Sequence, residues 1–232
     1  MPRHSRIVPQ DSALHVMCRG NNKQVVFHDD SDKLFYWKLL KELKTENKID
    51  IFHYCIMATH IHFIAWIIQM SRFAKFMKQL NLSYYNFYRR KYGYYGHVWQ
   101  GRYKSNVIET NVYLLQCGKY IELNPVRAGM VRMPEDYRFS SYRHYAFGIP
   151  DDVVSDSPEY IELAEHPLAR RERYIKFVVN DILVNSAKLA RAAIIGSDRY
   201  IEALCRQNGI KMGIPLIGRP RKKREASPFF EG

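Results

Sequence analysis

Residues 49–67, IDIFHYCIMATHIHFIAWI, constrain the fold most. The segment is long, rich in β-branched and aromatic residues, and free of glycine and proline, which is typical of one or two β-strands. A strand points alternate side chains to opposite faces, so His60 and His62 project together while Ile61 and Phe63 project the other way. The longest apolar run of the chain, FIAWII, is far too short to span a bilayer, so we expect no membrane association.

Strand and helix patterns alternate on both sides of this segment. Helical spacing of apolar residues extends over 29–48, 71–93 and 111–125. Strand-like runs are ALHVMCRG (13–20), QVVF (24–27) and HVWQGRYKSNVIE (97–109). The resulting order, β-β-α-β-α-β-α, predicts an α+β fold in which helices pack on an antiparallel sheet.

The composition changes near residue 145, which divides the chain into expected regions. Residues 1–145 form the main domain, and residues 146–166, with several prolines and acidic residues, predict a linker or wrap. Helical patterns resume over 167–210 as a small accessory region. Residues 211–232 form a basic tail that we expect to be disordered.

The formal net charge of +13 indicates a polyanionic partner, most often nucleic acid. The basic residues are interleaved with aromatic ones, which make up 14% of the chain, rather than gathered in one tail. The four cysteines form no C-x-x-C pair, which favours reduced thiols in a cytoplasmic protein. The first residues contain no apolar signal-peptide core.

His60 and His62 are suited to form half of a metal site, because two imidazoles on one rigid strand keep a fixed geometry. Tyr120 and Asn124 are four residues apart and share a helix face. An amide oxygen suits Mg²⁺ or Mn²⁺, and a phenol is a possible covalent nucleophile on a phosphodiester. A purely structural alternative stays open, in which Tyr120 packs its helix on the sheet and Asn124 caps it.

The ordered occurrence of RGNN, THIHF, WQGRYKS and YIELNP resembles the REP-associated tyrosine transposases, a branch of the single-tyrosine HUH transposases. The resemblance covers about residues 2–145 and makes this region the catalytic domain. It implies a ferredoxin-like fold that binds single-stranded or hairpin DNA of the repetitive extragenic palindrome type in the bacterial nucleoid. It also implies cleavage of one strand through a covalent 5′-phosphotyrosine, followed by rejoining.

The same resemblance implies roles for individual residues. Tyr120 is the expected nucleophile, and His60, His62 and Asn124 are the expected ligands of Mg²⁺ or Mn²⁺. Thr59 stands where the family often has asparagine; by strand alternation we expect it to point away from the metal. Tyr113, seven residues before Tyr120, is the main competitor for the nucleophile, while the spacing of Glu122 turns it away from Tyr120. A monomer and a homodimer both remain open.

The candidate DNA contacts are cationic, aromatic or turn residues, which suit a single strand. They are Arg19, Asn21, Trp99, Arg102, Tyr103, Lys104, Arg127 and Arg219. Arg219 lies in GRPRKK, which resembles an AT-hook core but equally fits a solvated basic tail. Two other functions stay open: a structured-DNA binding protein that does not cleave, and a metal-dependent phosphodiesterase that uses water.

Overall fold

A five-stranded sheet with the strand order β2-β3-β1-β4-β5 forms the centre of the protein. The computed structural model describes residues 9–180 and 194–207. The strands are β1 (Ser12–Arg19), β2 (Asp50–Ile56), β3 (His60–Ile67), β4 (Lys104–Ile108) and β5 (Ile194–Ile195). The helices are α1 (Asp30–Asn47), α2 (Met70–Tyr92), α3 (Val112–Glu122), α4 (Asn124–Arg127), α5 (Tyr142–Phe147), α6 (Pro158–Ile161), α7 (Pro167–Val179) and α8 (Asp198–Gln207), with 3-10 turns η1 (Asn21–Lys23) and η2 (Pro134–Asp136).

The first four strands are antiparallel to their neighbours, and the chain runs β1-α1-β2-β3-α2-β4. This is the ferredoxin-like arrangement, so the predicted fold class is confirmed. The sheet has one addition: β5 pairs in parallel with β4 at the edge. The short strand predicted at residues 24–27 is wrong, because Val26 and Phe27 both donate their backbone N–H to Ala58 O, at 2.9 and 3.0 Å, instead of joining the sheet.

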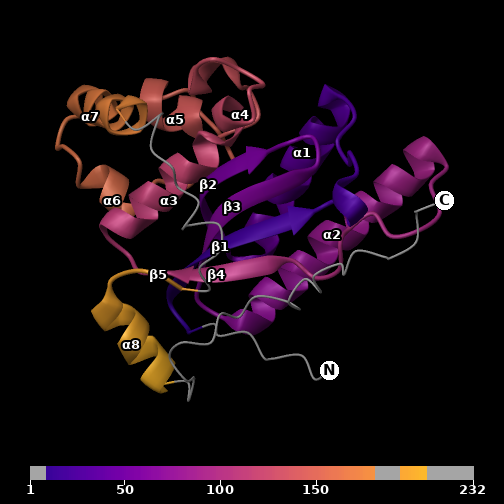
Figure 1. Cartoon of the computed structure of the whole chain (residues 1–232), viewed down its shortest axis with the longest axis horizontal. Coiled ribbons are helices and arrows are strands. Elements are labelled where there is room, and N and C mark those ends of the chain that lie inside the picture. The colour runs from indigo at the N-terminus through magenta and orange to yellow at the C-terminus, as the bar shows by residue number, and fades with distance from the viewer. Residues whose placement is uncertain (1–8, 181–193, 208–232) are drawn as a thin grey trace, which may run out of the picture.

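The two faces of the sheet are covered by different helices (Figure 1). On one face α1 and α2 pack against apolar residues such as Phe63, whose ring lies 6.2 Å from that of Phe76 on α2. On the other face α3 crosses β2 so closely that a Cβ added to Gly118 would lie 2.6 Å from the His53 ring. Because strand alternation assigns His62 to this second face, α3 covers the strand that carries the histidines.

Helices α5, α6 and α7 gather beside α3 (Figure 1). A second hydrophobic cluster joins them to it through Leu115, Leu123, Tyr142, Tyr145, Ala146, Tyr160, Tyr174 and Val178. Residues between α5 and α6 return to the main core, where Asp151 accepts hydrogen bonds from Trp37 Nε1 at 3.1 Å and Tyr54 Oη at 2.6 Å. The region after residue 140 therefore supports α3. The domain limits drawn from the sequence stay predictions.

The structure also bears on the predicted environment of the chain. All four cysteines are buried and none of them is in a disulfide. The reduced state expected from the sequence stays a prediction. Over residues 9–180 and 194–207, every helix is too short or too polar to cross a lipid bilayer.

Candidate active site

Strand β3 carries both predicted histidines on the face that α3 covers. In the register with β1, His62 lies opposite Met17 and His60 opposite Arg19. The two imidazole rings have centroids 5.0 Å apart and are nearly perpendicular, at 88°. His62 is buried and His60 is half-buried. The histidine pair thus forms one compact group at the start of β3.

A third histidine, His15 on β1, completes this group. Its Nε2 atom lies 2.8 Å from His62 Nδ1, and the two rings stack with centroids 5.0 Å apart. The alternation within ALHVMCRG places His15 on the same face as Arg19, but only the register between β1 and β3 brings it beside His62. Sequence patterns give no long-range register, so the sequence analysis missed this residue.

All three imidazoles are neutral at neutral pH. Burial lowers the pKa of His15 to about 4, and burial together with the charge of Arg19 lowers the pKa of His60 to about 4. Burial also lowers the pKa of His62 well below its ordinary value, with the neighbouring histidines and arginines adding to the effect. A neutral imidazole keeps one lone pair, so His60 and His62 have the protonation state in which histidine binds metal ions.

Tyr120, near the end of α3, lies against the histidines. Its ring centroid is 6.0 Å from that of His62 and 6.1 Å from that of His15, both in edge-to-face geometry. The Arg127 guanidinium stacks over the phenol ring at 4.6 Å, and its Nη1 donates to Tyr120 O at 3.0 Å. Burial raises the pKa of Tyr120, and the positive charge of Arg127 opposes that increase.

Asn124 stands just beyond the end of α3. Its Nδ2 atom donates to Tyr120 O at 3.0 Å and to Ile121 O at 3.1 Å, so the side chain caps the helix. Because the two carbonyls require the amide nitrogen on this side, Oδ1 is the atom that could bind a cation. Nowhere in residues 9–180 and 194–207 do three histidine, cysteine or carboxylate side chains gather as a metal site. A metal ion on the histidine pair would therefore need an amide, phenolate or phosphate oxygen as well.

Two predictions about neighbouring residues have different outcomes. The expectation that Thr59 points away is wrong, because its Oγ1 lies 2.8 Å from His60 Nδ1. Thr59 precedes the first residue of β3, so strand alternation does not extend to it. Glu122 does face away from Tyr120: its carboxylate is fully buried on the other side of α3.

Glu122 is the centre of a buried polar cluster that sequence analysis did not find. Its Oε1 accepts hydrogen bonds from Ser141 Oγ at 2.6 Å and lies 3.0 Å from His53 Nδ1, while Oε2 accepts from Tyr174 Oη at 2.6 Å. These partners come from β2, the start of α5 and α7, so one carboxylate ties α3 to three parts of the chain. A buried and fully hydrogen-bonded carboxylate fixes the position of its helix, and that helix carries Tyr120.

The turn after β1 joins three motifs that are far apart in the sequence. Gly20 N donates to Thr59 O at 2.9 Å, Asn21 N to Val98 O at 2.8 Å, and Gln100 N to Arg19 O at 2.8 Å. Glycine is required in this turn, since a Cβ on Gly20 would lie 2.4 Å from the carbonyl oxygen of Gln24. The RGNN, THIH and WQGR segments therefore meet beside the histidines.

Several predicted DNA contacts also lie together. Arg19, Trp99, Arg102, Tyr103 and Lys104 line one small cavity. A larger groove next to that cavity is lined by Asn21 together with Trp99, Arg102 and Tyr103. Arg102 and Lys104 are exposed, whereas Trp99 is half-buried and donates from Nε1 to Asn81 O at 3.3 Å. Arg127 lies apart from this set, over Tyr120, and Arg219 falls outside the described residues.

Comparison with known proteins identifies similar chains. Residues 10–124 match the family model of the IS200-like transposases. A solved REP-associated tyrosine transposase bound to a REP hairpin is 20% identical, with a TM-score of 0.52 over 67% of this chain and 93% of that chain, which shows the shared fold. A candidate transposase from Deinococcus radiodurans R1 is 15% identical, with a TM-score of 0.37 over 52% of this chain and 96% of that one. None of the curated proteins matches the chain.

Proposed function

We propose that the protein cleaves and rejoins single-stranded DNA with Tyr120 as the nucleophile, because residues 10–124 match the family model of the IS200-like transposases. The observation that carries the proposal is the Tyr120 ring, 6.0 Å from His62 and covered by the Arg127 guanidinium. The motifs favour the REP-associated branch, and a solved protein of that kind is bound to a REP hairpin. We therefore take hairpin-forming DNA as the substrate.

In the proposed step, Tyr120 Oη attacks the phosphorus of a phosphodiester. The new bond joins the phenolic oxygen to phosphorus, and the bond to the 3′ oxygen of the preceding nucleotide breaks. The phenol loses one proton, and the leaving oxygen gains one to become a free 3′-OH. The strand on the 3′ side of the cut remains joined through its 5′-phosphate to Tyr120 as a phosphotyrosine, and attack by a 3′-OH reverses the step to rejoin a strand.

The residues around Tyr120 prepare it for this step. Arg127 lowers the cost of forming a phenolate in a half-buried position. His15 holds the ring of His62, and when His62 donates from Nδ1 its Nε2 lone pair faces outward as a ligand. His60, His62 and Asn124 Oδ1 would hold Mg²⁺ or Mn²⁺, which when bound supplies positive charge beside the scissile phosphate.

The test is a covalent-adduct assay with an end-labelled hairpin that carries single-stranded flanks, in the presence of Mg²⁺ or Mn²⁺. We expect a labelled protein band that resists SDS, is lost in Tyr120→Phe and is kept in Tyr113→Phe. Tyr113 is a matched control, since it lies on the same helix about 10 Å along the axis.

Two other results would point to other functions. Cleavage that persists in Tyr120→Phe without an adduct would indicate a phosphodiesterase that uses water. Hairpin binding without any cleavage by the unchanged protein would indicate a structured-DNA binding protein.

A further inference from the structure

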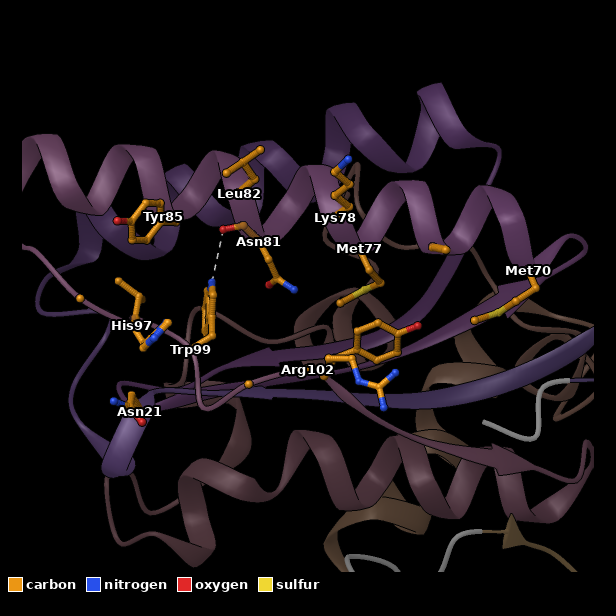
Figure 2. Close-up of a pocket in the computed structure, with 15 residues that line it drawn as sticks. Asn21, Met70, Met77, Lys78, Asn81, Leu82, Tyr85, His97, Trp99 and Arg102 are labelled. Carbon is orange, nitrogen blue, oxygen red and sulfur yellow. Dashed lines mark hydrogen bonds between the residues drawn. The ribbon is translucent and has the colours of Figure 1, made fainter. Parts of the chain in front are cut away.

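A groove of about 1010 Å³ runs between α2 and residues 96–103 (Figure 2). Because α2 packs on the face of the sheet opposite α3, the groove is separate from the Tyr120 site. Its apolar lining includes Met70, Met77, Leu82, Tyr85 and Trp99. Thioether and aromatic side chains of this kind suit the flat, polarisable surface of a nucleobase.

The charges on the groove also suit DNA. Lys78 and Arg102 contribute positive charge to its lining, His97 contributes a polar ring, and the lining formed by the described part of the chain contains no carboxylate. All three are exposed. In a protein of net charge +13, this arrangement favours a polyanion whose bases contact the apolar lining while its phosphates face the cations.

The groove also contains a polar group that lacks a partner. Asn81 Oδ1 is buried and makes no hydrogen bond, while the backbone carbonyl of the same residue is occupied by Trp99 Nε1. Figure 2 shows the Asn81 side chain directed from α2 toward the Trp99 and Arg102 side of the groove. A buried acceptor is costly unless a ligand supplies a donor, and the amino or imino N–H groups of bases are donors of this kind.

We propose that this groove binds unpaired nucleotides of the same DNA strand whose phosphodiester reaches Tyr120. This proposal rests on the proposed function, because it requires that DNA strand to be bound. From Met70 to Tyr85 the groove follows α2 for about 22 Å, at 1.5 Å per residue. Several stacked nucleotides, at about 3.4 Å each, fit along this length. Arg102 lines both the groove and the small cavity that contains Arg19, and Arg19 lies opposite His60 on β3. Cationic groups therefore mark a path from the groove to the active site.

The first test places a carboxylate in the groove. Leu82 is 51% exposed, so Leu82→Glu leaves the core intact; Ile161→Glu is the matched control, at 47% exposure on α6. The probes are one hairpin without flanks and the same hairpin with six unpaired thymidines on its 5′ or its 3′ side. We expect Leu82→Glu to bind one of the two flanked hairpins about tenfold more weakly than the unchanged protein does, a loss of about 1.4 kcal/mol in binding free energy. Its affinity for the bare hairpin should not change, and Ile161→Glu should bind all three probes like the unchanged protein. Equal binding of all probes by Leu82→Glu and the control would overturn the proposal.

A second test uses the salt dependence of binding. Lys78→Ala should reduce the slope of log K against log salt concentration by about 0.7, the value for one phosphate of a single strand. Lys75 is also on α2 but does not line the groove, and it forms an ion pair with Glu46. Lys75→Ala therefore removes the same charge outside the groove and should leave the slope unchanged. Equal slopes for the two variants would contradict the proposed phosphate contact.

A third test needs no variant. With 5-iodouracil in the flank, irradiation of the unchanged protein should crosslink peptides that contain Tyr85 or Trp99. Crosslinks found only elsewhere would refute the groove as the binding site.

The adduct assay distinguishes failure of the groove proposal from failure of the proposed function. Leu82→Glu at saturating DNA should still form the Tyr120 adduct. If the unchanged protein forms no adduct but crosslinks in the groove, the proposed cleavage fails while the groove proposal stands.

Discussion

Replacing His15 with leucine tests whether the third histidine prepares the site. The substitution removes the 2.8 Å hydrogen bond and leaves His62 Nδ1 buried without a partner. Loss of a residue that orients a metal-binding histidine usually lowers metal affinity by about 10–100-fold, which is about 1.4–2.8 kcal/mol. We therefore expect Mn²⁺ affinity to fall within that range.

The stability of the fold should change much less. Leucine leaves His62 Nδ1 without its partner, but it also removes His15 Nδ1, which is itself buried without a hydrogen bond, and it fills a similar volume. The two effects on stability oppose each other. We expect the free energy of unfolding to stay within about 1 kcal/mol of the original value.

The assay is Mn²⁺ binding followed by electron paramagnetic resonance, with urea unfolding measured in parallel. His166→Leu is the control, because His166 is exposed at the start of α7. His15→Gln, which can again hydrogen-bond to His62, should recover part of the affinity. Mn²⁺ binding by His15→Leu within twofold of the unchanged protein would refute the reasoning.

Three further substitutions have expected outcomes. Glu122→Ala leaves Ser141, Tyr174 and His53 without their buried acceptor, so we expect the free energy of unfolding to fall by about 3–5 kcal/mol. A loss below about 1 kcal/mol, measured by urea unfolding, would contradict the role of this cluster. Gly118→Ala puts a Cβ 2.6 Å from the buried His53 ring, and overpacking should lower the melting temperature, with a cost of about 1–3 kcal/mol. Arg127→Gln removes the charge that lowers the pKa of Tyr120, so adduct formation should reach half its maximum at a higher pH; an unchanged pH profile would argue against this contact.

Local patterns were sufficient to predict most of the fold. The Gly- and Pro-free segment at 49–67 forms β2 and β3, and the helical spacing around it gives α1, α2 and α3. The strand expected at QVVF failed because a run of four residues is too short to distinguish a strand from an extended turn held by Ala58 O. Strand β5 has two residues and pairs with β4 across some 90 residues, which no local pattern indicates.

The candidate site divides in the same way. Strand alternation predicted that His60 and His62 share a face, and the YIELNP motif indicated Tyr120 as the expected nucleophile. His15 and the Glu122 cluster depend on register and on contacts 19 to 69 residues apart, so their positions follow only from the folded chain. Thr59 was misjudged because the strand begins one residue later than the alternation assumed.

The most direct measurement of the central claim identifies the residue that carries the DNA. The covalent adduct is digested with nuclease and protease, and its peptides are analysed by mass spectrometry. The account predicts a nucleotide joined through its 5′-phosphate to Tyr120. A nucleotide on Tyr113 or another residue, or cleaved DNA with no modified peptide, would contradict it.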